Sequence, residues 1–257
     1  MDESKKEIQS SLHQLEIEEN VCIFYACESG SRAWGFPSED SDYDVRFLYI
    51  RPKNWYLSID EKRDIIEKPI NAMIDLNGWD IRKALKLLRK SNPPLLEWLK
   101  SPIIYQQRFM IADKIKALAP EYYSPKSCLY HYLHMAEGNF REYLKDEMVW
   151  VKKYFYVLRP ILACKWIEAD YGVVPMEFQT LVDTILTSGE LKTAIMDLIW
   201  RKQNGQELDM EPRIHIISKF IETEIERLKI IKPDGISIKP EAEKLDELFR
   251  WALEEVW

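Results

Sequence analysis

The sequence contains no long hydrophobic run. Its longest apolar tracts, such as YFYVL and VCIFYAC, fall far short of the roughly 20 residues that a membrane-spanning helix needs. The first twenty residues, MDESKKEIQSSLHQLEIEEN, have no apolar core of the signal-peptide type. These two absences exclude a membrane-spanning or secreted class of protein. We therefore expect a cytoplasmic protein with no membrane partner.

Cysteine is also scarce, and acidic residues outnumber basic ones. The four cysteines are widely separated and show no Cys-x-x-Cys spacing, so neither a zinc ribbon nor a disulfide framework is indicated. The formal net charge of −7 argues against a protein that coats nucleic acid through its overall field. A local basic patch could still bind phosphate. With 46% hydrophobic and 31% charged residues, the chain has the composition of an ordinary globular protein.

The chain changes character at about residue 80. Before that point strands and turns alternate with short helices, and beyond it almost every segment reads as helix. A helix is expected over about 3–18, and a tight turn with a short helix, ended by Pro37, follows Gly30. Four strands are expected in VCIFYACES, DYDVRFLYI, DIIEKPI and NAMIDLNG, the last two as a hairpin.

Two aspartates stand on the same side of the second predicted strand. Side chains alternate along a strand, so Asp42 and Asp44 point one way while Tyr43 points the other. Two like charges so close together raise each other's pKa unless a counter-charge lies between them. Magnesium is the usual counter-ion for carboxylate oxygens, although a polar strand start facing water also explains the pattern. Arg46 shares this face, where it could pair with an acid or reach a phosphate.

A third acid lies in the fourth predicted strand. In MIDLNGWD, Asp75 stands between Ile74 and Leu76, where a buried carboxylate would need a partner. Asp80 is the rival, but it precedes the amphipathic stretch IRKALKLLRK and suits a helix N-cap. We predict Asp75 as the third metal ligand and Asp80 as a cap. The stretch after Asp80 could follow a phosphate backbone or simply present a solvated basic face.

Three blocks together resemble a known family. GSRAWGFPSEDSDYDVRFLYI, DLNGWDIRKALKLL and KKYFYVLRPILACKWI, in this order, are similar to the YcgL-type, RNA-ligase-associated predicted nucleotidyltransferases of the DNA polymerase β superfamily. The resemblance covers about Val21 to Phe178. It implies an α/β (α+β) nucleotidyltransferase domain with a small mixed sheet at 1–122. An all-α helical bundle at 123–257 would close the active-site cleft.

The resemblance also implies an activity. The family moves a nucleoside monophosphate from an NTP such as ATP to a hydroxyl acceptor, and its RNA-repair context makes an RNA end one acceptor to consider. Asp42, Asp44 and Asp75 would be the catalytic acids and would hold two Mg²⁺ ions, for which Mn²⁺ could substitute. A turn at Gly30 and Ser31 would bring backbone N–H groups close to the phosphates, with Arg32 beside them. The alternative is a nucleotide-binding regulatory protein without turnover.

A second set of nucleotide-binding residues is expected in VWVKKYFYVLRPILACKWIEADYG. Apolar residues run almost all round this predicted helix, which indicates deep burial, and Pro160 should kink it. Lys152, Tyr156 and Arg159 fall on one face, and Lys153 lies next to it. A surface stripe with solvated ends would show the same spacing. Together with the family resemblance, the pattern favours contacts to the triphosphate and the base.

Overall fold

The chain forms two compact units. The computed structural model describes residues 3–39, 41–69, 73–206, 208–230 and 241–257. Unit 1 comprises Met1–Ala33, Ser41–Tyr123 and Ile238–Trp257, and unit 2 comprises Trp34–Asp40 and Ser124–Ser237. This division differs in two places from contiguous domains at 1–122 and 123–257. A short segment before the Asp-x-Asp strand belongs to unit 2, and the carboxy-terminal segment belongs to unit 1.

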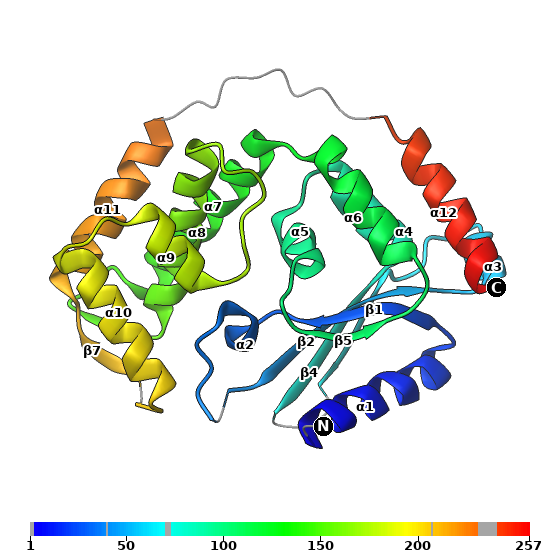
Figure 1. The fold of residues 1–257 in the computed structure, drawn as a ribbon, viewed down its shortest axis with the longest axis horizontal. Coiled ribbons are helices and arrows are strands. Elements are labelled where there is room, and N and C mark those ends of the chain that lie inside the picture. Colours follow the sequence, from blue (N-terminus) through cyan, green and yellow to red (C-terminus); the bar gives the residue numbers. More distant parts are fainter. Residues whose placement is uncertain (1–2, 40, 70–72, 207, 231–240) are drawn as a thin grey trace. The chain divides into compact units, whose positions relative to one another are not determined.

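Unit 1 is built around a β-sheet (Figure 1). Its strands are β1 (Cys22–Glu28), β2 (Tyr43–Ile50), β3 (Ile65–Pro69), β4 (Ile74–Asp80) and β5 (Ile104–Gln107). Its helices are α1 (Glu3–Glu19), α3 (Lys53–Tyr56), α4 (Ile81–Arg89), α5 (Pro93–Leu99), α6 (Ile111–Tyr122) and α12 (Glu243–Val256). The short helix α2 (Ser31–Trp34) begins in unit 1 and ends on the first residue of unit 2.

The sheet is mixed, which confirms the predicted α+β class. Over the part of the chain that the structure describes, the strand order is β3-β4-β2-β1-β5. Strands β2 and β4 are parallel neighbours, whereas the β1–β2, β1–β5 and β3–β4 pairs are antiparallel. The register sets Asp44 opposite Asp75 and Phe47 opposite Gly78. The predicted hairpin of β3 and β4 is therefore confirmed, and β4 lies beside the strand that carries the Asp-x-Asp motif.

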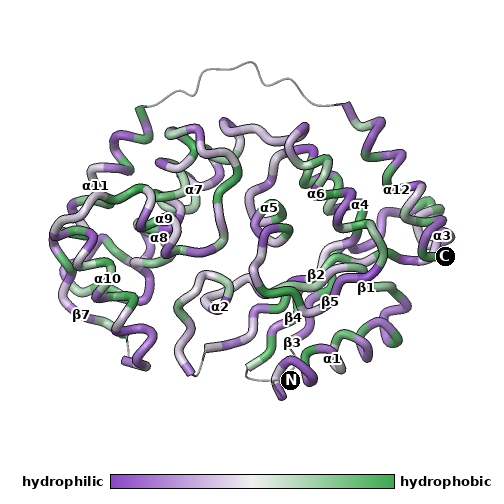
Figure 2. The backbone as a smooth tube through the Cα atoms, in the orientation of Figure 1, coloured by the Kyte–Doolittle hydropathy of each residue, from purple (hydrophilic) through white to green (hydrophobic). Residues whose placement is uncertain are grey.

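One face of the sheet packs under α1. The helix has hydrophobic and hydrophilic residues side by side along its length (Figure 2), and its apolar side chains Ile8, Leu12 and Leu15 are buried. They share a core with alternate residues of β2, such as Val45 and Phe47. Because alternate side chains leave opposite faces, Asp44 and Arg46 project from the face away from α1.

Helices α4, α5 and α6 cover the other side of the sheet (Figure 1). The rings of Trp79 on β4 and Trp98 on α5 stack with centroids 3.7 Å apart. The amphipathic pattern of α4 buries its apolar residues, among them Ile81 and Leu88. Asp80 caps this helix by accepting a hydrogen bond from the backbone N–H of Arg82 at 2.8 Å, as predicted.

Unit 2 is mainly helical. It contains α7 (Pro125–Tyr143), α8 (Lys153–Glu168), α9 (Phe178–Ile185), α10 (Glu190–Gln203) and α11 (His215–Ile230), with the short strands β6 (Met148–Trp150) and β7 (Met210–Pro212). Helix α8 is buried almost all round and includes Pro160. From the segment before β2, Phe36 stacks on Phe155 of α8 at 4.6 Å. This stacking places Phe36 in the core of unit 2, where it is buried.

Two local details differ from expectation. Beyond residue 80 most described segments are helical, as predicted, but the short strands there were not predicted: β5 pairs with β1, and β6 pairs with β7. These strands have only three or four residues, too few to show a clear alternation. Helix α2 ends at Trp34, before Pro37, because Gly35 adopts a left-handed φ of 93°.

Two absences expected from the sequence concern cysteine and membrane spans. All four cysteines are free, and Cys27, Cys128 and Cys164 are buried. Along the described residues, none of the helices combines the length and the apolar character that crossing a membrane requires.

Candidate active site

The turn after β1 brings Gly30 against Asp44. A Cβ atom built on Gly30 would lie 1.7 Å from Oδ2 of Asp44. A side chain larger than hydrogen at this position would therefore displace the carboxylate. We expected glycine here because phosphates would approach the backbone, whereas in the structure the carboxylate of the protein itself makes the close approach.

Asp44 and Asp75 share one guanidinium group. Arg46 donates from Nη2 to Oδ1 of Asp44 at 2.9 Å and from Nη1 to Oδ2 of Asp75 at 2.7 Å. One planar cation binds both carboxylates, so the two side chains project from the same face of the sheet. This arrangement is the one predicted from the sequence: Asp75 on a strand beside β2, with its carboxylate on the same face as that of Asp44.

Asp75 itself is not buried. Its side chain is 51% exposed, so the premise that an acid inside β4 must lack water is wrong. The residue is second in its strand, where the face it shares with Asp44 is still open to solvent. Asp80 is the buried acid of this strand, with no exposed surface.

Burial and the neighbouring charged groups shift the pKa of Asp44. Burial raises the pKa of Asp44 above its usual range, the Arg46 guanidinium opposes that shift, and the nearby carboxylates of Asp75 and Asp42 raise it further. The three acids are thus close enough to influence one another. Asp42 precedes β2 and is exposed.

Arg32 secures the backbone in front of the Asp-x-Asp strand. Its guanidinium donates to the carbonyl oxygen of Ser41 at 2.6 Å and to that of Asp42 at 3.3 Å. The same group lies over the ring of Tyr43, 3.8 Å from the centroid. In the structure Arg32 therefore ties the turn to β2, and it would have to leave these partners to contact a phosphate.

The acids fit a divalent cation in type, but they do not form a completed site. Among the described residues, no three acidic, histidine or cysteine side chains are grouped so that they could hold a metal ion. The guanidinium of Arg46 lies where two carboxylates converge, and so it stands in for a cation. A metal ion bound there would have to displace it.

Glu28 is a site residue that sequence reasoning missed. The last residue of β1 has no exposed surface. Its carboxylate accepts hydrogen bonds from the backbone N–H of Asp44 at 2.8 Å, from that of Gly30 at 3.3 Å and from the Tyr105 hydroxyl at 2.5 Å. Burial raises the pKa of Glu28, and these three bonds oppose the shift. Sequence reasoning missed it because a buried glutamate at the end of an apolar strand has the same neighbours in sequence as an exposed glutamate there.

The second predicted set belongs to unit 2. Lys152 precedes α8 and is exposed. The Lys153 ammonium lies 4.2 Å from the ring centroid of Tyr143 and 4.8 Å from that of Tyr156. Tyr156 is 38% exposed and meets the ring of Trp34 edge to face at 5.6 Å. These side chains form a partly exposed cationic and aromatic group at the start of α8.

Arg159 differs from the rest of that set. It is 3% exposed and donates to the backbone carbonyls of Pro175 and Met176 at 3.1 and 3.4 Å. Its guanidinium also lies 5.3 Å from the ring centroid of Trp34. Arg159 is therefore engaged in the core of unit 2 and is not presented as a ligand for phosphate.

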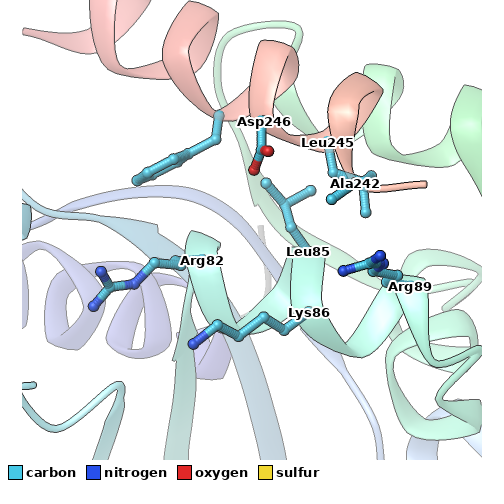
Figure 3. A pocket seen from close by; sticks show the side chains of 8 residues that line it. Arg82, Leu85, Lys86, Arg89, Ala242, Leu245 and Asp246 are labelled. Atoms are coloured by element: carbon cyan, nitrogen blue, oxygen red, sulfur yellow. The ribbon is translucent and has the colours of Figure 1, made fainter. Parts of the chain in front are cut away.

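A groove of about 280 Å³ lies between α4 and α12 in unit 1. Figure 3 shows Arg82, Lys86 and Arg89 of α4 on one side of it and Asp246 of α12 on the other. The remaining lining is apolar and consists of Leu85, Ala242, Leu245 and Phe249. The groove thus combines cationic side chains with an apolar floor.

The mixed sheet and the acids at the starts of two adjacent parallel strands agree with the polymerase β class of nucleotidyltransferases. The model of one family in this class, described as the RNA repair pathway DNA polymerase beta family (RlaP), matches residues 4–251. The chain belongs to this family, and the membership supports a nucleotidyltransferase.

Two similar proteins extend the comparison. The chain is 48% identical over 254 residues to the uncharacterized protein YcgL of Bacillus subtilis (strain 168), and the match covers 98% of each chain. The solved structure of a nucleotidyltransferase-like protein from Exiguobacterium sibiricum 255-15 aligns with 96% of this chain and 90% of its own. Its identity is 12% and its TM-score 0.31, so it adds no weight to the family membership.

Proposed function

We propose that this protein transfers a nucleoside monophosphate from an NTP to a hydroxyl acceptor in a Mg²⁺-dependent reaction. The observation that supports this most directly is the convergence of Asp44 and Asp75, from adjacent parallel strands, on one cation. The convergence lies next to the Gly30 turn. Membership of a polymerase β family supports nucleotidyl transfer as the chemistry of these acids.

In the proposed reaction, the acceptor oxygen forms a bond to the α-phosphorus while the bond to the pyrophosphate oxygen breaks. Asp42, Asp44 and Asp75 would hold two metal ions in place of the Arg46 guanidinium. Bound divalent ions of this kind neutralise charge on the phosphates and promote ionisation of the acceptor hydroxyl. The backbone at Gly30 and the hydroxyl of Ser31 would face the phosphates.

The cationic and aromatic group of unit 2 would contribute to nucleotide binding. Lys152 and Lys153 supply ammonium groups, and the partly exposed ring of Tyr156 offers a surface for a base. We assign Arg159 to the support of this group, because its guanidinium binds two backbone carbonyls and lies over Trp34.

An RNA end is the acceptor that we propose. The family description places its members in RNA repair, and the groove between α4 and α12 supports the choice. Phosphates could bind its cationic side, and an unpaired base could rest on its apolar floor. The net charge of −7 makes such a local surface necessary for any contact with RNA.

One observation favours a second candidate function, nucleotide binding without turnover. Arg46 neutralises two of the three acids, and a site kept in this state would bind no metal. The two functions differ in a measurable product, because only transfer releases pyrophosphate.

The test is incubation with each α-labelled NTP, Mg²⁺ or Mn²⁺, and RNA or small-molecule acceptors, with label transfer and pyrophosphate both measured. Asp42→Asn and Asp44→Asn should each lower transfer by at least about 100-fold, because each removes a charged ligand. Asp146→Asn changes an exposed aspartate of unit 2 and should have no effect. Transfer that persists in either active-site variant would refute the metal site, and bound NTP without pyrophosphate release would favour the second function.

A further inference from the structure

The side chain of Glu28 accepts a backbone hydrogen bond from β2 at the point where β1 ends. The strand ends at Glu28, and the chain then turns through Ser29 and Gly30 into α2. Just beyond the strand, the Ser29 N–H still donates to the carbonyl oxygen of Asp44 at 3.0 Å, whereas the N–H of Asp44 donates to a side chain. Oε1 of Glu28 accepts this N–H at 2.8 Å. A partly buried backbone donor is thereby satisfied.

The same oxygen also accepts the N–H of Gly30, at 3.3 Å. One carboxylate oxygen therefore joins the two backbone segments whose closeness defines the site, because Oδ2 of Asp44 occupies the place of a Cβ on Gly30. Because the approach is this close, a shift of either segment would move the Asp44 carboxylate.

The remaining contacts of Glu28 fix its own position. The Tyr105 hydroxyl on β5 donates to Oε2 at 2.5 Å, and the Ser101 hydroxyl donates to the Glu28 carbonyl oxygen at 2.6 Å. The three groups that reach the carboxylate are all donors, which suits an ionised side chain that can only accept. Hydrogen bonds to a charged acceptor are roughly twice as strong as neutral ones.

We propose that Glu28 is a positioning residue. Its buried carboxylate clamps the Gly30 turn to the Asp44 backbone and so directs the Asp44 side chain towards the reacting phosphate, without touching the substrate. This inference rests on the proposed nucleotidyl transfer, but the clamp itself can be observed without activity.

A graded series of variants tests the clamp. Glu28→Gln keeps the size and one accepting oxygen but loses the charge, and its amide can donate to the Tyr105 oxygen. We expect its kcat to fall about tenfold, with the KM for NTP changed less than twofold and Tm within a few degrees of wild type. Tenfold corresponds to about 1.4 kcal/mol in the transition state. Glu28→Leu removes both acceptors, and its kcat should fall at least 100-fold per folded molecule.

Two further variants complete the series. Tyr105→Phe removes only the donor to Oε2 and leaves the bonds to Gly30 and Asp44, so its kcat should fall less than that of Glu28→Gln. Glu224→Gln makes the same chemical change at a buried glutamate of unit 2, which pairs with Lys165 and Arg227. It should leave kcat unchanged even if Tm shifts.

The second readout is hydrogen exchange at the amides of Gly30 and Asp44. Both should be protected in the wild type and exchange at least tenfold faster in Glu28→Gln, while amides at the centre of β2 keep their rates. Unchanged exchange at these two amides, or a Glu28→Gln kcat equal to wild type, would overturn the inference. If the wild type transfers no nucleotide, the proposed function fails, and the exchange rates alone then decide whether the clamp exists.

Discussion

Asp75 and Asp80 lie on the same strand and have opposite surroundings. Asp75 is half exposed and pairs with Arg46 on the open face of the sheet. Asp80 has no exposed surface and accepts hydrogen bonds from the Tyr56 hydroxyl at 2.7 Å and from the N–H of Arg82 at 2.8 Å. Their odd separation along β4 turns them to different faces. Only Asp75 can join Asp44, so Asp80 is left with a structural role.

The buried state of Asp80 predicts a pH-dependent stability. Burial raises the pKa of Asp80 to about 6, whereas an unfolded aspartate titrates near about 3.9. The folded state therefore holds the proton more tightly, and this stabilisation is complete below the unfolded pKa and lost as the pH rises through 6. Two pKa units correspond to about 3 kcal/mol as an upper value.

Asp80→Asn isolates this contribution, because asparagine can still cap α4 through Oδ1 while its amide N–H donates to the Tyr56 oxygen. The free energy of unfolding of the variant, relative to wild type, should rise by up to about 3 kcal/mol between pH 4 and pH 7. Urea denaturation across this range measures it. A difference between the two proteins that stays constant with pH would contradict the buried, protonatable Asp80. Glu28 and Asp44, whose pKa values are also raised, remain in both proteins.

At the scale of the element, α4 separates its two faces clearly. Ile81, Ala84, Leu85 and Leu88 are buried, while Arg82, Lys86 and Arg89 recur every three to four residues along the side that lines the groove. Arg82 also lies 5.4 Å from the ring centroid of Tyr56. The amphipathic pattern alone explains why α4 is a helix. The groove between α4 and α12 adds a concave surface lined by the basic side chains of α4, which RNA could occupy.

A charge reversal on α4 tests this surface. Lys86→Glu changes an exposed side chain, so the fold should be kept and the Kd for a single-stranded RNA oligomer should rise three- to tenfold. The slope of log K against log salt should also become smaller by about 0.7, the value for one phosphate contact on a single strand. Fluorescence anisotropy at several salt concentrations measures both. Lys219→Glu makes the same reversal on an exposed lysine of α11, and equal effects of the two variants would rule out a specific site on α4.

At the scale of the whole molecule, unit 1 is not one continuous stretch of the chain. After α11 of unit 2, the chain returns to unit 1 as α12. Leu245, Leu248, Ala252 and Leu253 of this helix are buried. The ring of Phe249 meets that of Tyr56 at 4.9 Å, and the Lys114 ammonium lies 4.5 Å from the ring centroid of Trp251. The stability of the sheet unit therefore depends on the last helix of the chain.

Hydrogen exchange on two core variants tests this division. Leu248→Ala should cost about 2–5 kcal/mol and accelerate exchange in α4 and α6 more than in α7 and α8. Ile217→Ala, at a fully buried position on α11, should show the reverse pattern. If Leu248→Ala instead loosens α7 and α8 first, α12 belongs with the helices that precede it in sequence.

Much of unit 1 could be predicted because its signals are local. Apolar runs and alternation predict β1 to β4, and an acid before an amphipathic stretch predicts the cap of α4. The neighbourhood of Asp44 and Asp75 was also anticipated, but from the wrong premise of a buried Asp75; it results from the parallel pairing of β2 with β4. The short strand β5 was not predicted, because four residues are too few to show an alternation of apolar and polar side chains. Only its pairing with β1 makes this segment a strand.

The sequence by itself determined strands β1 to β4 and the cap of α4, which follow from residue type and spacing over a few positions. Its resemblance to a known family supplied the class of protein and the acids that we propose for its chemistry. Only the tertiary structure decided that Arg46 binds two acids, that Glu28 joins Gly30 to Asp44 and that α12 completes the sheet unit. Each of these depends on burial and on contacts between residues far apart in the chain. Such contacts produce no regular spacing of residue types from which they could be predicted.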